Sequence, residues 1–302
     1  MSVALRALNA WLRLTEKPFL SAAQDIPSVR RSFEQKAKFL FWPPQGCAFT
    51  ETRLADRPSV LIRPPQINDP PVSVFYLHGG AYLFGSPRTH RAMVAKLCSM
   101  GGFEAVLPSY RLAPEDPFPC ALEDALGAYE AWRAQNQNVV IGGDSAGGGL
   151  ALALLAEIIR LGLEPPIGLF TFSPLTDLTG KAPSLQANAA TDVILPADRM
   201  PEIAGYYLSG AAPANPRASP LFADFHNAPP VWMTVSDAEI LLDDARSMAS
   251  RLQEQGVKTD LQIEQDLPHG WPIFHNYLPE ARVTLAALAR WIRQLATQAA
   301  GS

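Results

Sequence analysis

Five glycines surround a single serine in the stretch GGDSAGGG, residues 142–149. The β-branched run NVVI precedes this stretch and the helix-forming run LALALLAEIIRLG follows it, so the chain passes from a strand to a helix through Ser145. The pattern Gly143-x-Ser145-x-Gly147 is typical of a nucleophile elbow, a turn so sharp that the serine hydroxyl stands clear of the sheet. A phosphate-binding loop would instead need a lysine or a G-x-G-x-x-G frame, and neither is present. The stretch therefore predicts a serine nucleophile.

The rest of the chain predicts the sheet that such an elbow needs. From residue 72 onward apolar strands alternate with helices, which favours an α/β fold with a mostly parallel sheet covered on both faces. We expect strands at 49–54, 59–64, 72–77, 104–110, 138–143, 168–173, 231–236 and 260–265, and helices at 88–100, 121–134, 146–161, 242–255 and 280–297.

Two segments interrupt this alternation: the first forty residues and an excursion from about 177 to 215. Long insertions in compact domains are usually functional, and both segments are expected to form a lid over the strand ends. The first of them is expected to begin with an amphipathic helix, which carries on one face Leu5, Leu8, Trp11, Leu12 and Leu14.

Composition excludes several function classes. The 302 residues are 48% hydrophobic and 18% charged, with a net charge of −4, which argues against nucleic acid and against an anionic membrane surface as partners. No apolar run is long enough to span a membrane, and charged residues interrupt the N-terminus where a signal peptide would have its apolar core. Three cysteines at unrelated spacings, Cys47, Cys98 and Cys120, predict reduced thiols, no metal cluster and a cytoplasmic location.

Glycine and histidine gather again in HGGAY, residues 78–82, directly after an expected strand. This pattern indicates an oxyanion loop of the HGGG type, in which Ala81 replaces the third glycine. The donors are expected to be the N–H groups of Gly80 and Ala81, joined by that of Ala146 after the serine. His78 is expected to orient the loop.

The catalytic base must be a late histidine if the chain order is serine, acid, histidine. His78 and His90 precede the serine, and His226 comes too early to leave room for an acid and a strand. His275 lies on an apolar turn and is expected to be packed. His269, in the loop DLPHGW after the last strand, is the predicted base.

The acid is expected at the end of the preceding strand, in SDAEILLDDA. Asp243 and Asp244 enter the following helix and are expected to cap it. Position alone leaves Asp237 and Glu239 as equal alternatives.

At this point the chain resembles the hormone-sensitive-lipase-like (bacterial family IV) carboxylesterases of the α/β-hydrolase superfamily. The resemblance rests on ordered motifs over nearly the whole length: HGGAY (78–82), YRLAPEDPFP (110–119), GDSAGG (143–148), SPLTDLTG (173–180), EILLDD (239–244) and HGW (269–271). It implies an α/β-hydrolase fold with a mostly parallel eight-stranded sheet and a helical cap. The cap would comprise residues 1–45 and 177–215, and the catalytic core residues 46–176 and 216–302.

The family pattern D-P-L-x-D-[DE], with its histidine about thirty residues later, aligns its first acid with Glu239 and leaves Asp237 in reserve. The resemblance thus implies a carboxylesterase for short-chain acyl esters with the triad Ser145, Glu239 and His269. It implies an oxyanion hole at Gly80, Ala81 and Ala146, no cofactor or metal, and a small-molecule ester as partner, with a homodimer possible.

Several points stay open at this level. Tyr82, Phe84 and Trp271 are expected to line the substrate pocket, below the cap residues Phe33, Phe41 and Tyr206, although each could equally be core. An amidase or formamidase would use the same triad. A non-catalytic small-molecule receptor on this scaffold is the other alternative, and the late His269 argues against it.

Overall fold

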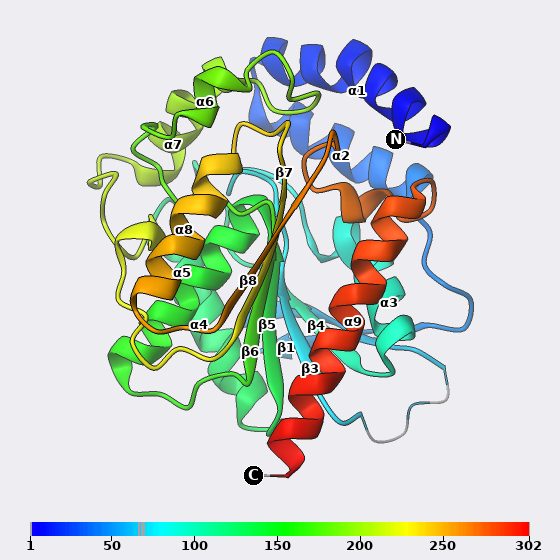
Figure 1. Cartoon of the computed structure of the whole chain (residues 1–302), viewed down its shortest axis with the longest axis vertical. Helices are drawn as coiled ribbons and strands as arrows, with labels where there is room; N and C mark the ends of the chain where they lie inside the picture. Colours follow the sequence, from blue (N-terminus) through cyan, green and yellow to red (C-terminus); the bar gives the residue numbers. More distant parts are fainter. Residues whose placement is uncertain (1, 66, 68–69, 302) are drawn as a thin grey trace.

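The computed structural model describes residues 2–65, 67 and 70–301 of the chain. One sheet of eight strands runs through the centre of the molecule (Figure 1). Its strands are β1 (Ala48–Leu54), β2 (Arg57–Arg63), β3 (Ser73–Leu77), β4 (Glu104–Pro108), β5 (Val139–Asp144), β6 (Gly168–Phe172), β7 (Val231–Ser236) and β8 (Thr259–Glu264). The expected strands are therefore present, each within a few residues of its expected bounds.

The strand order is β1-β2-β4-β3-β5-β6-β7-β8. Strands β3 to β8 pair in parallel, whereas β2 is antiparallel to both β1 and β4. From β3 the chain first moves to β4 on one side and then returns to β5 on the other. This order creates a switch point at the carboxyl ends of β3 and β5, where parallel α/β sheets bind their ligands. The expectation of a mostly parallel eight-stranded sheet is confirmed.

Nine α-helices belong to the described residues: α1 (Val3–Ala22), α2 (Ile26–Leu40), α3 (Pro87–Gly101), α4 (Cys120–Arg133), α5 (Ser145–Leu161), α6 (Ser184–Ala187), α7 (Met200–Leu208), α8 (Leu242–Glu254) and α9 (Pro279–Ala300). Short 3₁₀ helices occupy η1 (Ala197–Arg199), η2 (Pro220–Phe222) and η3 (Trp271–Phe274).

Helices cover both faces of the sheet. Helices α4, α5 and α8 pack on one face and α3 and α9 on the other (Figure 1). Alternate residues of the central strands enter the two cores: Phe75 and Leu77 of β3 belong to the first, and Val74 and Tyr76 to the second. Because both faces are covered, β3 to β7 read as continuous apolar runs.

Helices α1, α2, α6 and α7 gather above the carboxyl ends of the strands (Figure 1). Leu5 and Leu12 of α1 are buried in a third apolar cluster with Trp271 and Phe274 of η3. Leu14 was expected on the same face but is 77% exposed. It lies two residues beyond Leu12, which turns it by about 200° around the helix axis.

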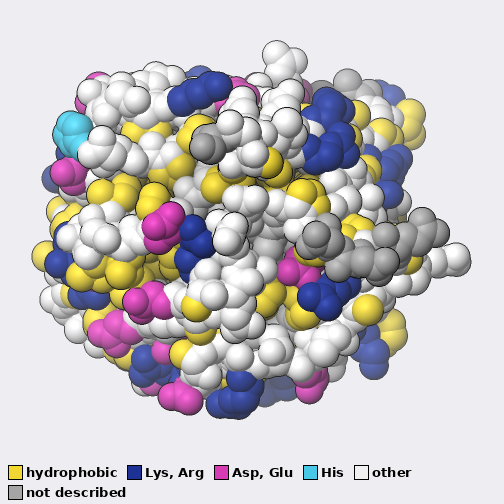
Figure 2. Space-filling model, turned by 90° about the horizontal axis from the view of Figure 1, so that it is seen from below, with side chains coloured by type: hydrophobic (Ala, Val, Ile, Leu, Met, Phe, Trp, Pro, Cys, Tyr) yellow, Lys and Arg dark blue, Asp and Glu magenta, His cyan; other side chains and the backbone are white. Residues whose placement is uncertain are grey.

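The opposite end of the molecule, seen in Figure 2, carries acidic and basic side chains interspersed with apolar ones. Such a mixture matches the small net charge of −4 and is typical of an ordinary solvent-facing surface.

The two aspartates expected to cap α8 bind neighbouring segments instead. Asp243 Oδ2 accepts the N–H of Ser184 at 2.8 Å. Asp244 is buried, and its Oδ1 accepts the N–H groups of Thr176 at 2.8 Å and Asp177 at 2.9 Å. Both aspartates do lie in the first turn of α8, as expected, but neither makes a side-chain cap of the helix, because their carboxylates bind N–H groups of the segment between β6 and α6 and of Ser184 at the start of α6.

Candidate active site

Ser145 occupies the sharp turn between β5 and α5. Its φ angle is 54°, in the left-handed region that side chains other than glycine rarely adopt, so the backbone is strained at this position. A Cβ on Gly147 would lie 2.2 Å from the carbonyl oxygen of Leu77, and one on Gly143 would lie 2.3 Å from that of Gly147. The flanking glycines are therefore required by close backbone packing against β3.

The loop after β3 brings backbone N–H groups to the same place. Gly80, Ala81 and Tyr82 all have positive φ angles, of 124°, 56° and 60°. Within the described residues the N–H groups of Gly80 and Ala81 donate no hydrogen bond, and both residues line the cavity that contains Ser145. Ala146 belongs to the first turn of α5, where backbone N–H groups lack carbonyl partners inside the helix. These groups are available to a developing oxyanion.

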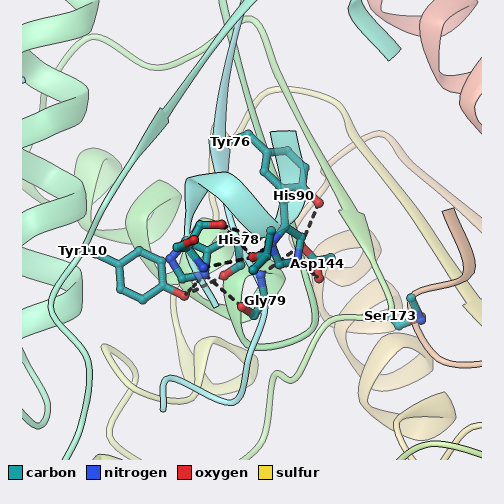
Figure 3. Close-up of polar contacts among 10 residues, drawn as sticks. Tyr76, His78, Gly79, His90, Tyr110, Asp144 and Ser173 are labelled. Carbon is teal, nitrogen blue, oxygen red and sulfur yellow. Dashed lines mark hydrogen bonds and ion pairs between the residues drawn. The ribbon is translucent and has the colours of Figure 1, made fainter. Parts of the chain in front are cut away.

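A buried polar network holds this loop from behind (Figure 3). The carboxylate of Asp144 accepts hydrogen bonds from the Tyr76 hydroxyl at 2.7 Å and from the Gly79 N–H at 3.0 Å, and His90 Nε2 lies 3.3 Å from it. Burial favours the neutral acid, but His90 and Tyr76 together hold the pKa of Asp144 below its ordinary value. An ionised carboxylate thus anchors the oxyanion loop to the residue that precedes the serine.

His78 packs within the same network. Its ring stacks on Tyr110 with centroids 4.3 Å apart, and the Tyr110 hydroxyl donates to the His78 carbonyl at 2.6 Å. Burial, together with the neighbouring His90, lowers the pKa of His78 to about 3. The ring therefore stays neutral and its place is fixed, as the predicted orienting role requires.

On the other side of the serine, His269 and Glu239 meet. His269 Nδ1 donates to Glu239 Oε2 at 2.5 Å. The second carboxylate oxygen, Oε1, accepts the Ser173 hydroxyl at 2.7 Å and the Ser236 N–H at 2.8 Å. Glu239 is 1% exposed, so these three bonds replace water around the charge. The carboxylate is held in one orientation, with one oxygen aimed at the imidazole.

The surroundings favour the protonated form of His269. Burial lowers its pKa, but the charge and hydrogen bond of Glu239, helped by the charges of Asp192 and Asp144, outweigh that effect and raise the pKa above 6.5. The site thus stabilises the imidazolium that would form when the ring accepts a proton.

Asp237, the alternative candidate for the acid, directly follows β7 and binds a backbone N–H group instead of a histidine. Its Oδ1 accepts the N–H of Asp266 at 2.8 Å, and its own N–H donates to the Glu264 carbonyl. The side chain is exposed and fastens the loop after β8 to β7. The structure brings Glu239, not Asp237, to His269.

A cavity of about 150 Å³ opens over Ser145, and His269, Gly80 and Ala81 also line it. Most of its wall is apolar and comes from the cap, for example from Phe19, Leu20, Val29, Phe33, Phe41 and Leu195. A polar element of the wall is the ion pair of Lys36 with Glu16, at 2.5 Å between α2 and α1. The cavity suits an apolar group attached to a reacting carbonyl.

Of the predicted pocket residues, Phe33, Phe41 and Phe84 line this cavity. Tyr82 and Trp271 do not belong to its lining, and the structure gives both packing roles instead. Tyr82 is buried against Tyr207 of α7, and the Trp271 ring is buried with its Nε1 donating to Thr284 at 3.0 Å. Tyr82 follows Ala81 by one residue and Trp271 follows His269 by two, so closeness along the chain suggested a cavity contact, whereas both side chains are packed in the interior.

Tyr206 of α7 lines a second, smaller cavity next to the first. Ala81, Phe84 and Leu195 belong to the walls of both cavities, so they separate them.

Three residues that support the site, His90, Asp144 and Ser173, were not predicted from the sequence to contact either Glu239 or the loop at residues 78–82. His90 was set aside because it precedes the serine, yet it lines the cavity and contacts Asp144. Ser173 stands at the end of β6 with a φ angle of 46°, and its hydroxyl binds Glu239. Asp144 and Ser173 lie inside the motifs GDSAGG and SPLTDLTG, and this could have marked them as site residues. The residues that they bind, Tyr76 and Gly79 for Asp144 and Glu239 for Ser173, are distant in sequence and could not be predicted.

The described residues contain no group of three or more histidine, cysteine, aspartate or glutamate side chains arranged for a metal ion. Likewise, none of the described helices combines the length and apolar character needed to cross a bilayer.

Comparisons with known proteins agree with this fold. A family model described as an alpha/beta hydrolase fold matches residues 74–273. An esterase of Acinetobacter venetianus is 34% identical over 229 residues, which cover 74% of this chain and 75% of that protein. An acetyl-hydrolase of Streptomyces hygroscopicus is 34% identical over 224 residues, covering 73% and 75%. The crystal structure of an esterase from the bacterial hormone-sensitive lipase family matches with a TM-score of 0.92 at 32% identity, over 98% of this chain and 99% of that one.

Proposed function

The chain belongs to the hormone-sensitive-lipase-like carboxylesterases of the α/β-hydrolase family and hydrolyses carboxylic esters, and from this premise we propose that Ser145, His269 and Glu239 form its catalytic triad. The observation that carries the proposal is the 2.5 Å hydrogen bond from His269 to Glu239, made beside a strained serine in one shared cavity. Glu239 keeps the Nδ1 proton of His269 in place, which leaves Nε2 as the base for the Ser145 hydroxyl.

The reaction then proceeds in two acyl transfers. Ser145 Oγ attacks the ester carbonyl while His269 takes its proton, and His269 returns that proton to the departing alcohol. Water, deprotonated by the same imidazole, attacks the acyl-enzyme and releases the carboxylic acid. Glu239 stabilises the imidazolium at both stages, in line with the raised pKa of His269.

The N–H groups of Gly80, Ala81 and Ala146 form the proposed oxyanion hole. Preorganised donors of this kind typically contribute a factor of about 10²–10³ each to kcat. Support comes from the N–H groups of Gly80 and Ala81, which donate no hydrogen bond within the described part of the chain and belong to residues that line the cavity. The Asp144 carboxylate anchors the loop through the N–H of Gly79.

Short acyl chains are the proposed substrates. The cavity of about 150 Å³ is comparable in volume to an apolar protein cavity that accepts benzene, roughly 150 Å³, and not to a long fatty chain. The acetyl-hydrolase among the relatives acts, by its name, on a short acyl group.

The cap is proposed to comprise residues 1–45 and 177–215, and the catalytic core residues 46–176 and 216–302. Residues 1, 66, 68–69 and 302 of these ranges lie outside the described part. Support comes from the cavity wall, to which both cap segments contribute. The cytoplasmic location rests on the cysteine pattern, and a homodimer stays a prediction.

A covalent label tests the nucleophile. An alkyl p-nitrophenyl phosphonate is expected to phosphonylate Ser145, which mass spectrometry of the digested protein would locate. Ser145→Ala is expected to lose the label and to lower kcat by a factor on the order of 10⁶, while the exposed Ser250→Ala serves as a control. Most of the activity surviving in folded Ser145→Ala would overturn the mechanism.

A further inference from the structure

One segment of the cap insertion, residues 188–195, binds the loop that carries the proposed catalytic acid Glu239. We call this loop, residues 237–240, the acid loop. Asn188 Nδ2 donates to the carbonyl oxygens of Asp237 at 2.9 Å and of Glu239 at 2.7 Å. The Thr191 hydroxyl donates to the Ala238 carbonyl at 3.0 Å. Three consecutive carbonyl groups of the acid loop thus find their partners on the cap.

The carboxylate of Asp192 joins the two sides of this contact. Its Oδ2 accepts the N–H of Ile240 at 3.0 Å, and Ile240 directly follows Glu239. Its Oδ1 accepts the N–H groups of Ile194 at 2.9 Å and Leu195 at 2.8 Å. Ile194 and Leu195 line the catalytic cavity, so one buried carboxylate fixes part of the substrate wall and the acid loop together.

Helix α1 fastens the same segment from outside. Lys17 Nζ donates to the carbonyl oxygens of Ala189 and Asp192, both at 2.6 Å. The segment is therefore held between α1 and the acid loop, and Asp192 has no freedom to turn away from either.

We propose that Asp192 is a positioning residue, which couples the substrate-contacting part of the cap to the orientation of Glu239 and supports the protonated His269 by its negative charge. The inference rests on the proposed triad. It assigns to Asp192 no contact with the substrate, since its effect passes through Ile240 and Glu239.

The charges around Asp192 make this coupling measurable, because the Asp192 charge affects the pKa of His269. The ionisable groups whose charges act on the Asp192 carboxylate are His269 and Glu239, whereas Lys17 of α1 binds the backbone carbonyl of Asp192. Burial raises the pKa of Asp192, and Glu239 raises it further, while His269 works in the opposite direction. Conversely, the Asp192 charge is one of those that raise the pKa of His269, after that of Glu239.

The test is Asp192→Asn, with kcat and KM for p-nitrophenyl butyrate measured across pH. An asparagine must point its NH₂ group either at the Ile240 N–H or at those of Ile194 and Leu195, so one link is lost. We expect kcat to fall about tenfold, as for one lost hydrogen bond to a charged group, with a smaller change in KM. The acidic limb of kcat/KM is expected to move to lower pH, because His269 loses a nearby negative charge.

Asp198→Asn is the matched control. It removes the same charge from an exposed position of the same insertion, and its kinetics are expected to equal those of the wild type. An unshifted acidic limb in folded Asp192→Asn, or a loss confined to KM, would overturn the inference.

Two further variants keep the test open if Asp192→Asn does not fold. Thr191→Val and Asn188→Ala each remove contacts to the acid loop, and each is expected to lower kcat more than it raises KM. Unchanged kcat in both would count against the coupling. Glu239→Gln separates the two proposals: if it keeps full activity the triad is wrong, whereas an inactive Glu239→Gln beside a wild-type-like Asp192→Asn removes the coupling alone.

Discussion

The ring of Tyr82 lies flat against the ring of Tyr207, with centroids 3.7 Å apart and planes inclined by 6°. Tyr82 belongs to the oxyanion loop and Tyr207 to α7 of the cap, and both are buried. The N–H of Phe118 adds a 2.8 Å bond to the Tyr207 carbonyl. The loop at residues 78–82 is thus packed directly against the cap through Tyr82.

Ala81→Gly is expected to widen the range of alcohols that the enzyme accepts. The Ala81 methyl belongs to the wall between the two neighbouring cavities, and its φ of 56° suits glycine better than alanine. Removal of the methyl joins space on both sides of the loop while the N–H donor remains. The ratio of kcat/KM for tert-butyl acetate to that for ethyl acetate measures the effect and is expected to rise. A lower ratio would mean that the methyl does not face the alcohol.

Glu239→Gln is expected to lower kcat by about 10⁴, or roughly 5 kcal/mol of transition-state stabilisation, because the amide cannot hold the imidazole tautomer or balance the imidazolium. Glu239→Asp keeps the charge but withdraws it by one methylene, so partial activity is expected. Asp237→Asn is the matched control, since among the described residues its carboxylate binds the N–H of Asp266 and not His269. The measurement is kcat and kcat/KM of all three variants for a short p-nitrophenyl ester near neutral pH. An inactive Asp237→Asn beside an active Glu239→Gln would move the acid to Asp237.

Butyrate esters are expected to be hydrolysed faster than palmitate esters, because the apolar cavity over Ser145 has a volume of only about 150 Å³ and is walled largely by cap residues. Phe33→Ala is expected to shift the preference towards longer chains, since Phe33 lines the cavity and packs edge-on against Phe84 at 5.5 Å. Phe39→Ala, on the same helix but 75% exposed, is the control. Rates are compared below the critical micelle concentration. Faster palmitate turnover by the wild type, or activation at an oil interface, would contradict the closed cap.

Asp244→Asn is expected to remove a pH dependence of stability. Burial, opposed by the N–H groups of Thr176 and Asp177, raises the pKa of Asp244 from 3.8 to about 7. The folded protein therefore holds this proton more tightly than the unfolded chain. The resulting stability is fully present below pH 3.8 and is lost as pH rises through about 7, at most roughly 4 kcal/mol.

The asparagine keeps the Oδ1 acceptor for both N–H groups and has no proton to lose. Guanidinium unfolding at a series of pH values is expected to give a flatter profile for Asp244→Asn than for the wild type, and a more stable variant at pH 8. The exposed Asp198→Asn is expected to reproduce the wild-type profile. Equal slopes for all three proteins would show that Asp244 does not titrate in this range.

Local patterns were enough to predict most of the fold. Buried parallel strands give continuous apolar runs, so the order of strands and helices could be predicted from the sequence. The glycines between β5 and α5 have a spacing with a steric cause, so the nucleophile elbow could be predicted as well. Leu14 was misplaced because a single apolar residue beside the true stripe of Leu5 and Leu12 weakens the helical period without ending it.

The supporting contacts of the site could not be predicted in the same way. Ser173 and Glu239 are 66 residues apart, and Asp192 and Ile240 are 48 apart. Neither contact has a local signature, because each depends on where the cap insertion and the strand ends meet in space. Asp237 and Glu239 are two residues apart, so strand position alone could not separate them. The family pattern favoured Glu239, and the fold brings the side chain of that residue to His269.

The bonds of α1 also constrain the order in which the protein is completed during synthesis. Lys17 binds carbonyl groups 172 and 175 residues later in the chain, and Arg199 binds the carbonyl groups of Leu20, Ser21 and Ala23 at the end of α1. Helix α1 is synthesised long before these partners, and the apolar face of Leu5 and Leu12 stays uncovered until Trp271 and Phe274 have also been translated. A chain arrested before that point carries the elbow serine without the completed cavity wall, so hydrolytic competence is acquired late in translation.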